Sequence, residues 1–433
     1  MADTGNFGEK AKVRGWLARN PVFGLGVLFG LMYFAQGICE PTEGLLKQPV
    51  QSLLKSWGAT TFVMGVFSFL LSQPWNIKPL YGLLTDFVPL LGTRRKGYLI
   101  VTSSVASLGL LAIFFRPPPA GAVWLLLAAL VVPTIAIAFG DVVIDALMVE
   151  KGKPLGATGR LQSIQWASIY AADMLVGVIG GYLSEYHLQN VAFLICAVAA
   201  GVALPVTLLF VREPVRARPT GSAREVVRNL VSAFKTRSML AVGAFIFLCM
   251  FNPFYLDVKN VHFTKSLHFS EAFYGTMLSL QAAGSLAGAA SYGFYCRRVP
   301  FGMLIHLCIA LGVASTLLYW LVEDEQSAAI ISPIVGFTYM TALIVQLDLA
   351  AMVCPPIIAG TAFAAMMSLS NAGTSFSNMI GTWLYDVVSF LLRDSQQAYN
   401  LLVALGAACT ACCWLLVPQL RRCHLMGSEE SSN

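Results

Sequence analysis

Charged residues are scarce in this sequence. Only 12% of the 433 residues are Asp, Glu, Lys or Arg, whereas 57% are hydrophobic. A soluble domain has about 25% charged residues. A soluble core of this size has no use for so much apolar surface, so the composition excludes an ordinary soluble protein. It predicts an all-α membrane protein that crosses the lipid bilayer several times.

Several functional signatures are also missing. No Walker sequence is present, which argues against an ATP-driven pump. No Arg-rich voltage-sensing helix or filter-like loop is present, which argues against a channel. The five histidines and ten cysteines show no metal-ligand spacing, and Cys412 and Cys413 are interpreted as packing residues. We therefore expect no enzyme, no metal or other cofactor, and no nucleic-acid partner.

The apolar residues are grouped into twelve stretches long enough to span a membrane, which takes roughly 20 residues each. They cover residues 22–43, 60–83, 98–115, 122–147, 161–183, 191–211, 239–260, 271–293, 301–321, 329–352, 357–388 and 397–418. The eleventh is too long for one straight span, so part of it is expected outside the membrane. A polar internal segment separates the first six stretches from the last six. This pattern predicts the major facilitator fold of two six-helix bundles, 1–212 and 239–433, joined by a cytoplasmic linker, 213–238.

The positions of the basic residues predict the orientation. If the N-terminus is cytoplasmic, 21 of the 28 Lys and Arg lie in cytoplasmic segments and six lie in external loops. Both termini are therefore expected in the cytoplasm. We expect a monomer in the inner or plasma membrane of the cell.

Residues 78–98, KPLYGLLTDFVPLLGTRRKGY, concentrate charge in an apolar region. Gly82 to Asp86 begins like the loop motif of major facilitator proteins. There the glycine permits close helix approach, and the aspartate accepts from a helix N-terminus and a cation. Arg94 and Arg95 follow after a longer spacer than usual. We interpret this loop as a conformational latch that gates the cytoplasmic side.

Ionisable residues at membrane depth are expensive, so each is a candidate functional residue. Lys78 lies about 12 Å deeper than Asp86 along a helix. One alternative is that it snorkels to the surface. The other is that it pairs with Asp141 or Asp145, which lie four residues apart on one face of the fourth span.

Asp173 is expected near mid-bilayer in the fifth span, where it would bind a proton or substrate. Trp166 and Tyr170 share its helix face. These two rings would either stack on a planar ligand or simply pack.

Other polar residues in the spans are weaker candidates. Glu40 and Glu43, toward the outer end of the first span, either line the outer mouth or are solvated. Asn371, in the eleventh span, suits a hydrogen-bonding ligand or a helix–helix contact. Asp257 and Lys259 end the seventh span and are expected at the membrane interface.

Several segments together resemble the folate-biopterin transporter family, a branch of the major facilitator superfamily. They are YFAQG, QPWNIKPLYGLLTDFVPLLGTRRKGYLI, DVVIDALMVEKG, LQSIQWAS followed by GGYL, FTKSLHFSEAFYGT and CPPIIAGTAFAAMMSLSNAG. The long spacer after Asp86 fits this family. The resemblance implies proton-linked movement of folates, pterins or related molecules. The sequence departs from the family pattern at two positions. Ala359 stands where an acidic residue is common, and Asp173 is an aspartate that the pattern lacks. The resemblance places the following residues on family-pattern positions: Lys78, Gly82, Asp86, Arg94, Arg95, Asp141 and Asp145.

The leading hypothesis is a proton-coupled symporter of a folate- or pterin-like small molecule, working by alternating access. Protonation of Asp173 or of the Asp141/Asp145 pair would permit the loaded carrier to turn over. Because Lys78 is the only deep cation predicted, a neutral or singly charged ligand is favoured. The alternatives are a carrier of a nucleobase, amino acid or muropeptide, and a non-transporting assembly factor. The muropeptide-permease and acetyl-CoA-transporter groups share a similar lysine and basic loop.

Overall fold

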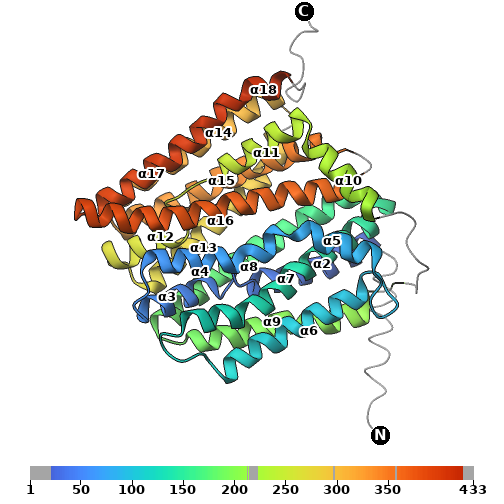
Figure 1. Ribbon diagram of the computed structural model, residues 1–433, viewed down its shortest axis with the longest axis horizontal. Helices are drawn as coiled ribbons and strands as arrows, with labels where there is room; N and C mark the ends of the chain where they lie inside the picture. The colour runs from blue at the N-terminus through green and yellow to red at the C-terminus, as the bar shows by residue number, and fades with distance from the viewer. Residues whose placement is uncertain (1–20, 212, 214–222, 296–297, 356–357, 423–433) are drawn as a thin grey trace, which may run out of the picture.

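Long helices make up the structure. The computed structural model describes residues 21–422 apart from 212, 214–222, 296–297 and 356–357. Within these residues the helices lie side by side along one direction (Figure 1). The β-type pairing found there is an isolated bridge between Leu90 and Thr93. The prediction of an all-α protein is confirmed.

The helix bounds follow the predicted stretches closely. In the first half of the chain the helices are α2 (Pro21–Cys39), α3 (Lys47–Ser56), α4 (Thr61–Asn76), α5 (Lys78–Phe87), α6 (Lys96–Phe115), α7 (Val123–Gly152), η1 (Lys153–Leu155), α8 (Thr158–Glu185) and α9 (Gln189–Phe210). Beyond them come α10 (Ala223–Phe234), α11 (Arg237–Cys249), α12 (Asp257–Val261), η2 (His262–Ser266), α13 (Glu271–Tyr295), α14 (Phe301–Leu317), η3 (Leu318–Leu321), α15 (Glu325–Val353), α16 (Ala359–Leu392), α17 (Ser395–Cys412), η5 (Cys413–Leu416) and α18 (Val417–Arg422).

Each predicted span overlaps one helix or a run of consecutive helices. Eight of the described helices are long and apolar enough to cross a membrane. The number is nine if α10 and α11, which meet at a bend of 76°, form one broken span. The second predicted span is divided into α4 and α5, and the seventh into α11 and α12. The multi-pass architecture is therefore confirmed, with interruptions that the apolar stretches did not reveal.

Two helices, α3 and α10, were not predicted. Each has 12 residues or fewer and mixes polar with apolar residues, so neither stands out in a search for 20-residue apolar stretches. In contrast, α16 is one continuous helix of 34 residues. At 1.5 Å per residue it is about 51 Å long, longer than a hydrocarbon core of about 30 Å.

The first and second halves of the chain come into close backbone contact where α8 meets α13. A Cβ atom added to Gly275 would lie 2.1 Å from the carbonyl oxygen of Gly177. Small residues permit such close backbone approach. Ser279 of α13 also donates to the carbonyl of Met174 at 2.6 Å. A close contact therefore connects the two halves along α8 and α13 in this conformation.

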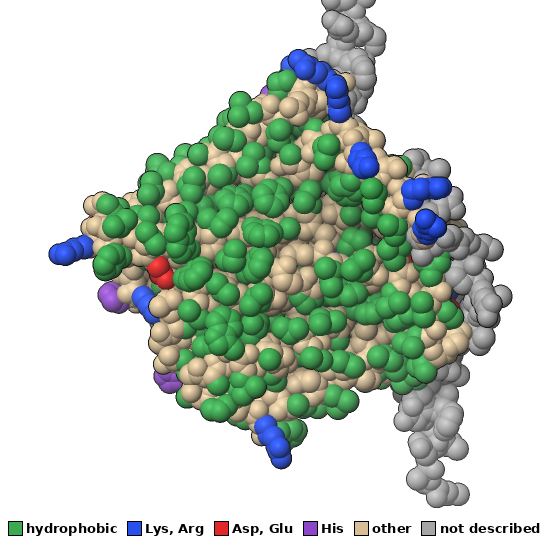
Figure 2. Space-filling model, viewed as in Figure 1, with side chains coloured by type: hydrophobic (Ala, Val, Ile, Leu, Met, Phe, Trp, Pro, Cys, Tyr) green, Lys and Arg blue, Asp and Glu red, His purple; other side chains and the backbone are tan. Residues whose placement is uncertain are grey.

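The outer surface is apolar over its broad face. Figure 2 shows hydrophobic side chains covering this face, with Lys and Arg near its rims. Leu108 on α6 and Val198 on α9 are 66% and 60% exposed. An apolar surface of this extent suits contact with lipid.

Candidate functional site

The break between α4 and α5 positions Lys78. Pro79 follows it and has no N–H to donate to the carbonyl of Trp75 one turn earlier. Asn371 of α16 donates to this carbonyl instead, at 3.4 Å. Ile77 leaves the helical conformation (φ −103°, ψ 15°), and the Lys78 ammonium lies 4.5 Å from the centre of the Trp75 ring. In this structure Asn371 makes a helix–helix contact, which was one of its two predicted alternatives.

Lys78 is paired with Asp141 of α7. Its Nζ lies 2.6 Å from Asp141 Oδ2, and the two side chains are only 16% and 6% exposed. The pairing is confirmed, and the snorkelling alternative is wrong for this conformation. Gln36 of α2 donates to the other oxygen of Asp141 at 2.5 Å. Three helices, α2, α5 and α7, thus meet at one carboxylate.

Asp145 lies one turn further along α7 and has neutral partners. Tyr33 of α2 donates its hydroxyl to Asp145 Oδ1, and Gln165 of α8 donates to the same oxygen at 3.0 Å. Within the described part of the chain, no Lys or Arg lies within ion-pair distance of Asp145. The cluster therefore holds two carboxylates and one ammonium. Its surplus negative charge is costly to bury, and a proton on one carboxylate would neutralise it.

The two glutamates after α2 differ in environment. Glu40 is 8% exposed, and its carboxylate accepts from the backbone N–H groups of Thr42 at 2.9 Å and Glu43 at 2.5 Å. Glu43 itself is exposed. The chain continues from here into α3, and the place of both residues toward the outer end of the first span stays a prediction. They lie in an interruption between two helices.

Trp166 and Tyr170 contribute to the contact between the two halves of the chain. Their ring centroids are 6.0 Å apart with an interplanar angle of 26°. The Tyr170 hydroxyl donates to the sulfur of Met340 on α15 at 3.0 Å, and Tyr170 also packs with Ala282 of α13. In this conformation the two rings serve packing, the second predicted alternative.

Asp173 is half-buried on α8, close to other charged groups. Glu43, Glu40 and Lys47 lie near enough to interact with it electrostatically. No hydrogen bond or ion pair to its carboxylate is found among residues that the structure describes. A role for Asp173 in binding a proton or substrate stays a prediction.

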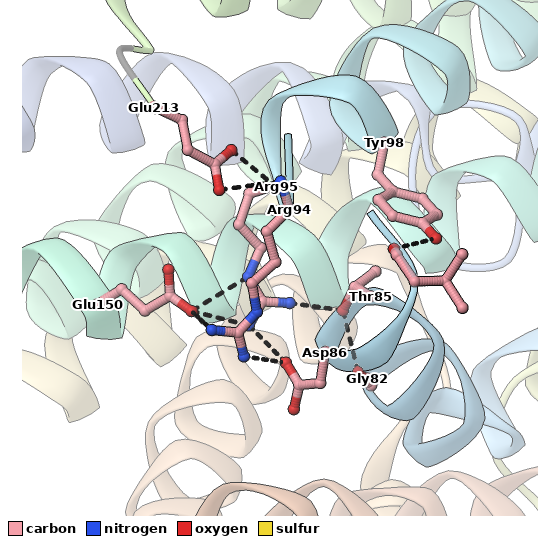
Figure 3. Close-up of polar contacts among 9 residues, drawn as sticks. Gly82, Thr85, Asp86, Arg94, Arg95, Tyr98, Glu150 and Glu213 are labelled. Atoms are coloured by element: carbon pink, nitrogen blue, oxygen red, sulfur yellow. Dashed lines mark hydrogen bonds and ion pairs between the residues drawn. The ribbon is translucent and has the colours of Figure 1, made fainter. Parts of the chain in front are cut away.

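The predicted latch residues converge on one carboxylate (Figure 3). Arg94 Nη2 and Arg95 Nη2 lie 2.6 and 2.7 Å from Asp86 Oδ1. Arg95 also contacts Glu150 Oε1 at 2.8 Å and donates to Thr85 Oγ1 at 2.5 Å. Its side chain is only 4% exposed, whereas that of Arg94 is 30% exposed. The guanidinium of Arg95 is the centre of this cluster, and Glu150, at the end of α7, was not predicted to join it.

The N-terminus of α6 is capped by Glu213, which follows α9. Its carboxylate accepts from the backbone N–H groups of residues 94–96 at 2.9–3.1 Å. Such groups lack partners within the helix and favour a negative charge. Among the described residues Asp86 contacts the guanidinium groups of Arg94 and Arg95, and the predicted contact with a helix N-terminus is made at α6 by Glu213 instead. The close approach predicted at Gly82 is wrong, because an added Cβ would meet only Val142 Cγ1, at 3.9 Å.

Two further buried charges lie on α12. Asp257 and Lys259 are 1% and 3% exposed, so both are enclosed by the protein, and their place at the membrane interface stays a prediction. Asp257 accepts from Gln51 at 2.6 Å and Asn378 at 2.7 Å, and the Lys259 ammonium lies 4.2 Å from the centre of the Tyr255 ring. The seventh span was counted as one helix, but α11 ends at residue 249 and an irregular segment precedes α12.

The interruptions of the first and seventh spans correspond. α2 ends at Cys39 and α11 at Cys249, 210 residues later (249 minus 39). α3 begins at Lys47 and α12 at Asp257, again 210 residues later (257 minus 47). Interrupted helices at equivalent positions of two halves are typical of transporter substrate sites. Glu40, Glu43 and Tyr255 lie in these interruptions.

Comparison with known proteins identifies the family. The BT1 family model matches residues 41–431. The "Folate-biopterin transporter" of Synechocystis sp. is 27% identical over 82% of this chain and 73% of that protein. "Probable folate-biopterin transporter 4" of Arabidopsis thaliana is 24% identical over 85% and 90% of the two chains. "Folate transporter 2" of Plasmodium falciparum is 23% identical over 82% and 78%.

Solved structures with the same fold are more distant in sequence. The nucleoside transporter NupG superposes with a TM-score of 0.69 at 13% identity, covering 92% of this chain and 99% of its own. A POT family transporter in complex with 5-aminolevulinic acid gives 0.69 at 12% identity, covering 92% and 96%. These likenesses establish the major facilitator fold. The chain belongs to the BT1 family and is a multi-pass membrane transporter, not an enzyme.

Proposed function

We propose that the protein moves a folate- or pterin-like small molecule by proton-coupled symport. The observation that carries this proposal is the buried cluster of Lys78, Asp141 and Asp145, in which the ammonium pairs with Asp141 and the second carboxylate has only neutral donors. The names of curated relatives, folate-biopterin and folate transporters, supply the substrate class.

The cluster suggests how a proton would be used. When both carboxylates are ionised, Tyr33 and Gln165 hold the unpaired charge of Asp145 by hydrogen bonds. A proton on Asp145 would remove the net charge, so the surrounding helices would no longer have to solvate it while they move. Asp173, on α8 near Glu43, is the second proposed proton site.

We further propose that residues 1–212 and 239–433 form the two moving bundles and that both termini are cytoplasmic. The ion pairs of Asp86, Arg94, Arg95 and Glu150 connect α5, the start of α6 and the end of α7. All of these elements belong to the first bundle. The latch would therefore act by holding the ends of these helices together as one rigid unit during alternating access.

Uptake into liposomes tests the proposal. Purified protein is reconstituted, and uptake of labelled folic acid and of biopterin is followed with and without a pH gradient. We expect uptake to rise with the gradient and to fall when a protonophore is added. Uptake that is indifferent to the gradient would refute proton coupling.

The same preparation tests the substrate class. If neither compound enters, the folate assignment is wrong. A thermal-shift panel of nucleobases, amino acids and muropeptides would then identify the class that stabilises the folded protein.

A further inference from the structure

Lys259 is a buried ammonium without a carboxylate partner. Its Nζ lies 3.2 Å from Gln281 Oε1 and lies over two aromatic rings, 4.2 Å from the centre of Tyr255 and 5.5 Å from that of Tyr319. No acidic side chain of the described chain lies within ion-pair distance. The charged group near enough to act on it is Lys47, which carries the same sign. Aromatic faces attract a cation but do not neutralise its charge.

The other buried lysines show what is missing. Lys55 and Lys78 pair with Glu271 and Asp141. A buried charge normally has a counter-charge or is costly. Lys259 is as deeply buried as either, so an anion from outside the chain would supply a counter-charge.

Side chains around this ammonium line a cavity, although Lys259 itself is not on the cavity wall. Tyr255, Gln281 and Tyr319, the three side chains around Lys259, also line a space of about 80 Å³ within the second half of the chain. A cavity that holds a single water molecule needs about 10–15 Å³, so this space is large enough for a small organic group. Two buried amide oxygens on its wall, Asn252 Oδ1 and Gln346 Oε1, have no hydrogen-bond partner. These oxygens would accept from N–H groups.

We propose that Lys259 and its cavity form a subsite for the carboxylate end of an aromatic ligand. The ammonium would pair with the carboxylate, the tyrosine rings would flank the aromatic ring, and the orphan amide oxygens of Asn252 and Gln346 would accept from its N–H groups. The inference rests on the proposed function in that this ligand is the transported molecule. It assigns the anionic end to the second half of the chain, beside the interruption that precedes α12, and so favours a ligand that bears a carboxylate.

A matched pair of small probes tests the subsite without requiring transport. The melting temperature of the purified full chain is measured with p-aminobenzoate and with p-aminobenzamide, which has the same ring but no charge. We expect stabilisation by the carboxylate and little by the amide. Equal stabilisation by both probes, or by neither, would overturn the proposal, and this comparison needs only the wild-type protein.

Variants then locate the effect. Lys259→Met is expected to weaken binding of p-aminobenzoate by about tenfold or more, because a buried charge pair is lost. Lys265→Met removes an exposed lysine six residues further on and is expected to change nothing. If Lys259→Met binds the carboxylate as tightly as wild type, the ammonium is not the anion site.

Transport separates this inference from the proposed function. Lys259→Met should reduce uptake of folic acid, which bears carboxylates, much more than uptake of biopterin, which has none. Equal loss of both would indicate a structural lysine and overturn the subsite. If wild type takes up neither compound, the proposed function fails, and the aminobenzoate comparison alone decides on the subsite.

Discussion

Asp141 and Asp145 lie one turn apart on α7, but their partners give them different expected roles. Asp141 has the ammonium of Lys78, whereas Asp145 has only neutral donors. We predict that Asp145→Asn reduces accumulation driven by a pH gradient by about tenfold or more, because the variant has no carboxylate to protonate. Exchange of labelled for unlabelled ligand, which needs no net proton movement, should persist. Tyr33→Phe keeps the carboxylate and serves as the control, so gradient-driven accumulation that survives in Asp145→Asn would contradict this role.

Arg94 and Arg95 are neighbours in sequence with very different burial. Arg95→Ala should lower the unfolding free energy by about 3 kcal/mol, the lower end for breaking a buried pair, because Asp86 and Glu150 keep some access to water. Arg94→Ala, with a side chain 30% exposed, should cost less than about 1 kcal/mol. Thermal unfolding of the purified variants measures both. Equal losses would show that Arg95 is not the centre of the latch.

The Lys78–Asp141 pair was predictable because the depth of each residue in the membrane could be counted along a continuous helix from its predicted cytoplasmic end. Asp141 and Asp145 also share a helix face. The burial of Lys259 was not predictable, since it depends on where α11 ends. Glu213 was missed although it lies only two residues after the sixth predicted span. It caps a helix N-terminus more than a hundred residues earlier. A single sequence does not show which residues so far apart come into contact.

At the scale of helices, the α8–α13 contact depends on glycine. We predict that Gly275→Ala destabilises the protein by about 1–3 kcal/mol, because its Cβ would meet the backbone of Gly177 rather than a side chain that can move. Gly159→Ala, on α8 where no atom lies within 4 Å of the added Cβ, should change stability by less than about 0.5 kcal/mol. Thermal unfolding compares the two, and an unaffected Gly275→Ala variant would mean that the helices separate easily.

Helices with long apolar runs were predictable to within a few residues, because hydropathy marks what must face lipid. The interruptions after α2 and α11 were not recognised, although a proline lies in each, Pro41 and Pro253. Other prolines of this chain, such as Pro74 in α4 and Pro133 in α7, lie inside helices, so a proline alone does not mark an interruption in a single sequence. α3 could therefore not be predicted from its own residues, because recognising it depends on recognising the interruption before it.

At the scale of the whole molecule, the two candidate sites lie in different halves of the chain. Lys78, Asp141 and Asp145 belong to the first half, and Lys259 with its cavity belongs to the second. A ligand held between them would contact both halves. Alternating access then requires that contacts between the halves open at one end of the molecule while the ligand is bound.

The contact that should open lies where α3 meets the start of α13. Lys55 pairs with Glu271, and Gln48 donates to the Glu271 carboxylate at 2.9 Å. We predict that cysteines at positions 55 and 271, joined by a short bifunctional thiol reagent, stop uptake, and that a reducing agent restores it when the linker is cleavable. Each single cysteine, treated with the same reagent, controls for modification of the chain's native cysteines. Because the linker prevents separation without filling either site, ligand stabilisation in the thermal-shift assay should survive in the cross-linked protein. Uptake that continues after cross-linking would show that these helices stay together during transport, and that the moving boundary between the halves lies elsewhere.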